Sequence, residues 1–220
     1  MFAWIDAFIE RIPGLVVLWL SLSVHEWAHA RAASALGDDT ANAQGRMSMD
    51  PLVHVDGIGT ILLPIVGIPM GWARPVPVNP SGFSRRWPMT LGMALCAAAG
   101  PASNLLIAAV AFVGLAGVAS FAPGAYDSPV GALAWLFLRM NLILAVFNLL
   151  PVPPLDGSRL VNHLLPRGLR GYWERLERVG PIAVFLLLAV LGVMQLQPFA
   201  LLDASALWAL ARVVELLTGG

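Results

Sequence analysis

The stretch IPGLVVLWLSLSVHEWAHARAASAL, residues 12–36, decides how this chain folds. A bilayer span needs about 20 mainly apolar residues, so this stretch predicts a transmembrane helix. Its second half contains His25, Glu26 and His29. Ionisable side chains within a span are energetically costly and are usually retained for function. The same stretch therefore predicts a membrane helix and a functional site on that helix.

The composition of the whole chain agrees with a membrane protein. Of the 220 residues, 58% are hydrophobic and 12% are charged, whereas about 25% are charged in soluble domains. Thirteen basic residues balance thirteen acidic ones, so the basic excess of a nucleic-acid binder is missing and we expect no nucleic-acid partner. The single cysteine, Cys96, excludes a disulfide framework or a cysteine zinc site within the chain. Any metal must be held by histidine and carboxylate.

Further apolar stretches predict three more spans, at Met89–Phe121, 130–150 and 179–196. A fifth stretch, 201–217, carries three charged residues and is either a span or an amphipathic interfacial helix. We therefore expect an all-α polytopic membrane protein with four transmembrane helices, or five if 201–217 also crosses. Arg139 lies inside the third span, where a cation needs a partner, a watery cavity or a route to the interface.

The arginines of the connecting segments predict an orientation. Segment 37–88 carries four, segment 122–129 none and segment 151–178 five. Under the positive-inside rule, 37–88 and 151–178 are cytoplasmic and the N-terminus is outside. The histidines near the end of the first span then lie toward the cytoplasmic side. Within the last segment, RGLRGYWERLER (167–178) has the composition of an interfacial helix.

Segment 37–88 is more than a plain loop. GTILLPIVGIPMGW (59–72) is apolar but too short and too interrupted by glycine and proline to span, so we expect it to re-enter the membrane. An ordinary cytoplasmic hairpin is the alternative. AQGRMSM (43–49) and ARPVPV (73–78) suit short edge strands or polyproline. We expect a small β and re-entrant segment that can hold an extended substrate by β-augmentation.

His25, Glu26 and His29 form the pattern H-E-x-x-H. Positions i and i+4 share a helix face, so both imidazoles can reach one Zn²⁺ while Glu26 meets a metal-bound water. A catalytic zinc usually has three protein ligands, so one more is needed. Asp156 is best placed, because it follows the third span at the cytoplasmic level. The full set of candidates for the third ligand is Asp50, His54, Asp56, Asp156 and His163.

Three motifs carry a family resemblance: HEWAH (25–29), GPASN (100–104) and NLLPVPPLDG (148–157). Together they resemble the site-2 protease family of intramembrane zinc metalloproteases. DPLVHVDGIGTILLP (50–64) and ARPVPVNP (73–80) resemble the compact prokaryotic members without PDZ or CBS domains. The resemblance covers about 13–165. It implies a single membrane-embedded metalloprotease domain over 1–220, with C-terminal anchor helices in 166–220, in a prokaryotic cytoplasmic membrane.

The resemblance also implies a metal centre. His25, His29 and Asp156 would bind one Zn²⁺ per chain, and Glu26 would be the catalytic base. A helix N-cap is the alternative role for Asp156.

Three further residues have less specific roles. Asn104 and Asn148 match family asparagines that position substrate or polarise the scissile carbonyl, and ordinary interhelical hydrogen bonds are the alternative. His54, just before the re-entrant stretch, is a gate or a spare ligand, and a structural loop histidine is the alternative.

The expected activity is intramembrane proteolysis, with a transmembrane protein as substrate and the lipid bilayer as environment. A membrane zinc hydrolase acting on a small or lipid substrate is one alternative. A non-proteolytic zinc protein, either a metal transporter or a substrate-binding scaffold, is the other. Glu26 argues against a non-proteolytic role, because neither transport nor scaffolding needs a base beside the metal.

Overall fold

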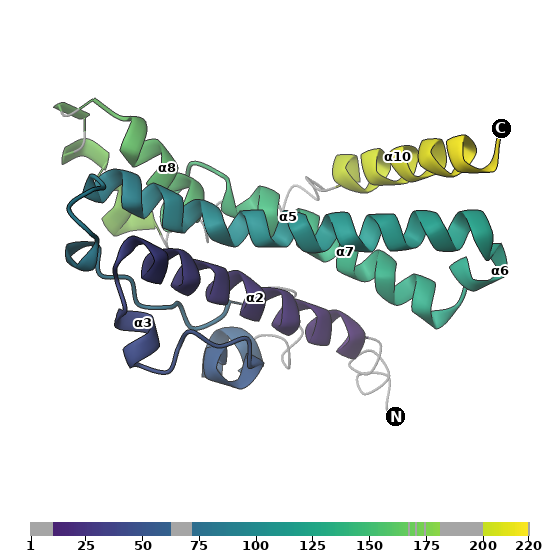
Figure 1. Ribbon diagram of the computed structural model, residues 1–220, viewed down its shortest axis with the longest axis horizontal. Coiled ribbons are helices and arrows are strands. Elements are labelled where there is room, and N and C mark those ends of the chain that lie inside the picture. Colours follow the sequence, from purple (N-terminus) through teal and green to yellow (C-terminus); the bar gives the residue numbers. More distant parts are fainter. Residues whose placement is uncertain are drawn as a thin grey trace.

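The computed structural model describes residues 11–62, 72–166, 168–169, 171–173, 175–180 and 200–219. Within these ranges every regular element is a helix and there is no β-strand. The long helices run along the long axis of the molecule (Figure 1). The all-helical class predicted from the sequence is confirmed for these ranges.

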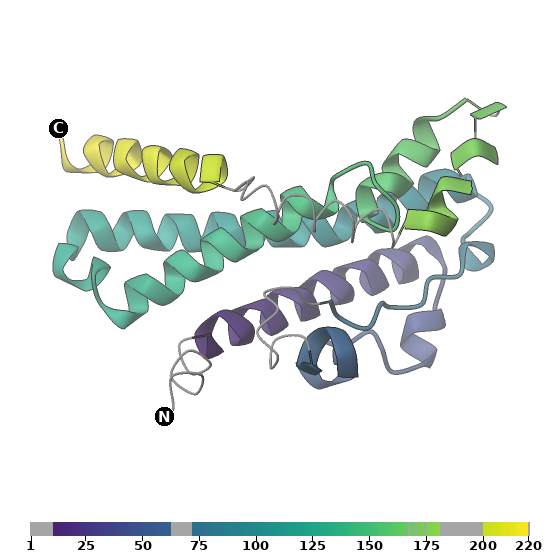
Figure 2. The ribbon, with the colours of Figure 1, turned by 180° about the vertical axis from the view of Figure 1, so that it is seen from behind.

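Helix α5 (Met89–Phe121) is the central element. It contacts α2 (Ile12–Leu36), α7 (Pro129–Asn148) and α10 (Ala200–Thr218), and the short α8 (Asp156–Leu164) packs beside its first half. Helix α6 (Pro123–Tyr126) forms the turn between α5 and α7. The view from behind shows the same order, with α2 and α10 on opposite sides of the α5 and α7 pair (Figure 2).

Helices α5 and α7 are long and apolar enough to cross a membrane. Their outer surfaces are apolar as well: Leu106, Val110, Val113 and Val130 are 66%, 67%, 70% and 71% exposed. Leu106, Val110 and Val113 are spaced i, i+4 and i+7 and so share one face of α5, as expected for a lipid-facing helix. Helix α2 forms with the predicted bounds but is not among the helices that meet this length and hydropathy criterion.

The other two predicted spans have different outcomes. Most of the fourth predicted span, 179–196, lies outside the described residues, because only residues 179 and 180 of that stretch are described. The stretch 201–217 forms α10, whose Ala206 and Leu210 pack in one apolar cluster with side chains of α5 and α7. Asp203 of α10 accepts hydrogen bonds of 2.8 and 3.0 Å from Nε of Arg139. The cation inside the third predicted span is thus paired with a carboxylate.

In the described parts of the segment between α2 and α5 (37–62 and 72–88), the regular elements are short turns of helix rather than strands. They are α3 (Thr40–Ala43), η1 (Pro51–His54), η2 (Gly57–Leu62) and η3 (Pro80–Gly82). Neither 43–49 nor 73–78 forms a strand, so the strand alternative predicted for these residues is not found, and the polyproline alternative stays a prediction. Residue 45 is a glycine with φ +65°, which turns the chain where a strand would continue. Of the predicted re-entrant stretch 59–72, residues 63–71 lie outside the described ranges.

The ends of this segment meet. Gly37 ends α2 with φ 110°, and the backbone N–H of Ser84 donates to the carbonyl of Leu36 at 2.8 Å. Asp38 is buried and accepts from the backbone N–H of Asn79 at 2.6 Å. Burial alone would raise the pKa of Asp38, but hydrogen bonds from Thr40 and Asn79 stabilise the carboxylate and lower it.

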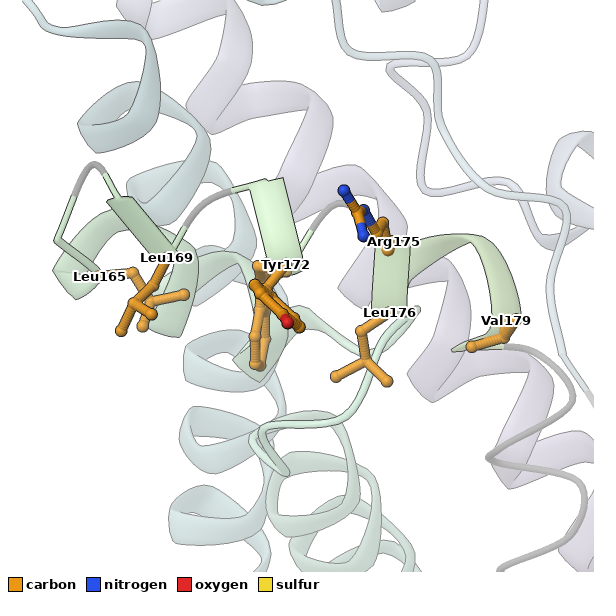
Figure 3. Close-up of a pocket in the computed structure, with 7 residues that line it drawn as sticks. Leu165, Leu169, Tyr172, Arg175, Leu176 and Val179 are labelled. Atoms are coloured by element: carbon orange, nitrogen blue, oxygen red, sulfur yellow. The ribbon is translucent and has the colours of Figure 1, made fainter.

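After α8, the described parts of 168–180 are helical and form an open apolar hollow. Leu169, Tyr172 and Leu176 hang from the same side of the chain (Figure 3). The Arg175 guanidinium lies 5.6 Å from the centroid of the Tyr172 ring. This exposed apolar face is what an interfacial helix requires, and the membrane-surface role of 167–178 stays a prediction.

Candidate active site

Three side chains from two distant parts of the chain converge beside α5. His25 and His29 lie one turn apart on α2, and Asp156 is the first residue of α8. Their ligand atoms lie within 4.8 Å of one another. The two Nε2 atoms are 3.0 Å apart, and Oδ2 of Asp156 lies 3.2 Å from Nε2 of His25 and 3.4 Å from Nε2 of His29.

These separations suit a tetrahedral metal. Zinc bonds of 2.0–2.1 Å at tetrahedral angles place ligand atoms about 3.3 Å apart. Oδ2 of Asp156 is buried without a hydrogen-bond partner among the described residues, and such an atom is costly unless something binds it. Two imidazole nitrogens facing a carboxylate oxygen are the ligand types that zinc prefers. The residues present therefore fit a bound zinc ion.

The far side of each imidazole is also fixed. Nδ1 of His29 lies 2.7 Å from the carbonyl oxygen of Cys96, and Nδ1 of His25 lies 2.6 Å from Oδ1 of Asn104. Metal-binding histidines commonly donate their second ring N–H to an oxygen in this way, which leaves Nε2 free for the metal. Asn104 is fully buried and lies behind His25, so its contact is with a predicted ligand.

Gly100 lets α5 approach these rings. A Cβ at this position would overlap Nε2 of His29 and lie 2.6 Å from Cε1 of His25. Real Cβ contacts are not this short, so a side chain here would displace one or both rings. The glycine of the GPASN motif is thus required by the close packing of α5 against the metal-binding group.

Glu26 faces a different segment from the two histidines. Its Oε2 accepts a 2.8 Å hydrogen bond from the backbone N–H of Val76. Pro75 and Pro77 on either side have no N–H, so Val76 supplies the donor of this tripeptide. The nearby Arg46 Nη2 donates to the carbonyl of Arg74 at 2.7 Å. The proline-rich segment is therefore held against the H-E-x-x-H helix.

The remaining candidates for a third ligand have structural contacts. Asp50 and Asp56 accept backbone hydrogen bonds at the starts of η1 and η2. Nε2 of His54 lies 2.8 Å from the carbonyl of Ser48, and Nδ1 of His163 lies 3.3 Å from the hydroxyl of Thr90. The metal-binding group formed by the described residues includes none of the four.

Asn148 lies at the end of α7, half-buried. Its side-chain amide donates to the carbonyl of Leu144 in the same helix at 2.9 Å. Its predicted role in positioning substrate stays a prediction.

Asn141 was missed by the sequence interpretation. It is fully buried on α7 and accepts a 2.8 Å hydrogen bond from the side-chain amide of Asn104. The available signal was an amide within an apolar span, a residue type that commonly bonds between helices.

An H-E-x-x-H helix, a distant aspartate and apolar packing helices define a membrane protein with a candidate metallopeptidase centre. The peptidase family M50 model matches residues 120–191. "Putative zinc metalloprotease YwhC" of Bacillus subtilis (strain 168) is 41% identical over 186 residues, which cover 83% of this chain and 82% of YwhC. The chain therefore belongs to peptidase family M50, the site-2 protease family.

A more distant relative agrees. "Putative zinc metalloprotease Rip2" of Mycolicibacterium smegmatis is 32% identical over 172 residues, covering 74% of this chain and 61% of Rip2. No solved structure matches the chain.

Proposed function

We propose that this protein is an intramembrane zinc metalloprotease that cleaves peptide bonds within or near transmembrane segments of membrane proteins. The observation that carries the proposal is the convergence of His25, His29 and Asp156 on one point, next to Glu26 on the same helix. The family and the names of its relatives supply the reaction class.

The metal we propose is one Zn²⁺ per chain, held by His25, His29 and Asp156. When bound, zinc would polarise the scissile carbonyl and make a water more acidic. The protein's part is to fix the ligands: Cys96 and Asn104 orient the two imidazoles, and Gly100 leaves room for them.

Glu26 carries the proton in this proposal. As general base it takes a proton from the attacking water, and it then passes the proton to the leaving amine. The N–H of Val76 holds one carboxylate oxygen at 2.8 Å. A carboxylate that is already oriented loses less conformational freedom when the substrate arrives.

The substrate must be extended before it is cut. A transmembrane helix has every peptide group bonded internally, so local unwinding leaves backbone groups that need new partners. The irregular segment 73–79 lies beside Glu26 through Val76 and has no strand partner among the described residues. We propose that the unwound substrate pairs with this segment.

Replacing the proposed base tests this function most directly. Glu26→Gln keeps the shape and an acceptor for Val76 but cannot take a proton, so cleavage of a single-span substrate in liposomes should fall about 10²–10⁴-fold. Zinc content should stay at the wild-type value. Glu215→Gln, the same chemical change on an exposed residue of α10, is the matched control and should cleave normally.

Three outcomes contradict the proposal. Cleavage by Glu26→Gln near the wild-type rate would show that Glu26 is not the general base. A wild-type protein that retains zinc but cleaves no peptide substrate would favour a metal transporter or scaffold. Hydrolysis of a small or lipid ester alone would favour a zinc hydrolase that acts on such substrates.

We also propose that the site faces the cytoplasm. Asp39 and Asp127 lie toward opposite ends of the long axis, beside α3 and α6 (Figure 1). In a Cys96→Ala background, a membrane-impermeant thiol reagent added to intact cells should label Asp127→Cys but leave Asp39→Cys unlabelled. The opposite labelling pattern would place the metal-binding group on the exterior side.

A further inference from the structure

A chain of buried amides leads from the metal-binding group into the packed helices. Oδ1 of Asn104 lies 2.6 Å from Nδ1 of His25, and Nδ2 of Asn104 donates to Oδ1 of Asn141 at 2.8 Å. Nδ2 of Asn141 then donates to the hydroxyl of Ser21 at 2.9 Å and to the carbonyl of Phe137 at 2.8 Å. Ser21, Asn104 and Asn141 each have 0% exposure.

The Phe137 carbonyl sets the direction of every bond in this chain. A carbonyl oxygen only accepts, so the group of Asn141 that faces it must be the NH₂. Oδ1 of Asn141 then faces Asn104, so Asn104 must donate from its own NH₂ group. Oδ1 of Asn104 therefore faces His25, and Nδ1 of His25 must be the protonated ring nitrogen. This leaves the lone pair of His25 on Nε2, the atom that faces Asp156.

The two histidines reach the same tautomer by different routes. His29 is set directly, because its Nδ1 lies 2.7 Å from the carbonyl of Cys96. His25 is set at a distance, through one amide on α5 and a second on α7. The path returns to α2 at Ser21, one helical turn before His25, so it joins three helices in a closed circuit.

We infer that Asn141 is a positioning residue for the metal centre: through Asn104 it holds His25 in the tautomer that presents Nε2 to zinc. The inference rests on the zinc site proposed above, and it adds a residue two hydrogen bonds away from the ligand. Without Asn141, the Asn104 amide can turn over and present NH₂ to His25, which favours the tautomer protonated on Nε2.

Zinc affinity of the purified full-length protein, measured against a competing chelator, is the first test. Asn141→Leu and Asn104→Leu should each weaken zinc binding about 10–100-fold, the usual effect of losing an outer-shell partner. Asn104→Asp still accepts from Nδ1 of His25, so it should lose less zinc affinity than Asn104→Leu, although its second oxygen then faces Oδ1 of Asn141. Ser103→Ala removes a bond to the carbonyl of Gly100 within α5, and this matched control should bind normally.

The tautomer itself is the second test, and it needs no metal. Nitrogen NMR of the histidine-labelled, zinc-free protein should show His25 protonated on Nδ1 in wild type and Asn104→Asp, with the Nε2-protonated form appearing in Asn141→Leu. A wild-type His25 protonated on Nε2 but not on Nδ1 would overturn the inference even if the protein binds no zinc. If Asn104→Asp binds zinc as weakly as Asn104→Leu, the hydrogen bond to His25 does not matter for the metal, and the two asparagines only fill space between the helices. Unchanged zinc affinity and an unchanged His25 tautomer in Asn141→Leu would show that Asn141 does not position His25. If Asn141→Leu does not fold, the comparison of Asn104→Asp with Asn104→Leu decides.

Discussion

The two halves of α5 are held in place by different forces. The first half, before residue 105, buries mainly small and polar residues, among them Gly92, Ala94, Cys96, Ala97, Gly100 and Asn104. The second half buries Ala108, Leu115 and Ala116 in an apolar cluster with Leu138 of α7 and with Ala206 and Leu210 of α10.

The difference teaches where precision is needed. Hydrogen bonds and a missing Cβ fix the first half, and these accept few substitutions because donors, acceptors and distances must all match. Dispersion and close packing fix the second half, and apolar cores tolerate volume-conserving changes. One helix thus combines an exacting end that carries the site with a tolerant end that anchors it.

Two glycines of α5 give the sharpest test of this contrast. Gly100→Ala should abolish zinc binding and cleavage, because its Cβ would overlap both imidazoles. Gly117→Ala, in the second half, has no atom within 4 Å of the new Cβ, so it should be neutral or stabilise the helix by up to about 1 kcal/mol. Zinc content and thermal unfolding of the two variants are the measurements. Normal zinc binding by Gly100→Ala would show that the first half of α5 tolerates a side chain beside the imidazoles.

A cavity in the tolerant end should affect stability without affecting the metal. Leu115 is 1% exposed, and Leu115→Ala should lower the free energy of unfolding by about 2–5 kcal/mol. Zinc affinity, measured below the unfolding transition, should match wild type. A parallel loss of zinc affinity would mean that the two halves are coupled. Leu115→Met, which nearly conserves volume, is the control.

The smallest expected effect concerns the ion pair that joins α7 to α10. Arg139→Leu and Asp203→Leu should each destabilise the protein, and the double variant should lose less than the sum of the two. Coupling measured by such a cycle should be about 1 kcal/mol, the range for polar contacts between membrane helices. Additive losses in steric-trapping or denaturant measurements would show that the pair observed at 2.8 Å contributes no net coupling.

The sequence predicts the parts of the site that depend on one helix or on span direction. The i, i+4 spacing of His25 and His29 places both imidazoles on one face, and parallel spans bring Asp156 to their level. The structure brings these three together, and their catalytic roles stay predictions. The bounds of α2 and α5 match because Gly37 and Pro88 are strong helix boundaries.

Features that depend on how helices are rotated against one another were not predictable. Apolar residues are spread around the whole circumference of α7, so its hydrophobic pattern does not reveal which face turns inward. Asn141 and Asn148 are both amides of one apolar span, yet Asn141 bonds to α5 and α2, whereas Asn148 donates to the Leu144 carbonyl of its own helix. The strand alternative predicted for 43–49 is not found, because Gly45 adopts a left-handed conformation that turns the chain within the alternating pattern.

The hydrogen bond between Ser84 and Leu36 has a consequence for how this protein can vary. The chain leaves the end of α2 at Gly37 and returns to the same place at Ser84, and Asn79 bonds to Asp38 beside it. A connecting segment whose two ends lie together can change in length without moving the helices that it joins. Each doubling of such a loop costs only about 0.6 kcal/mol of closure entropy. The register of α2 against α5, and with it the metal-binding group, is therefore insulated from the size of the segment that connects them.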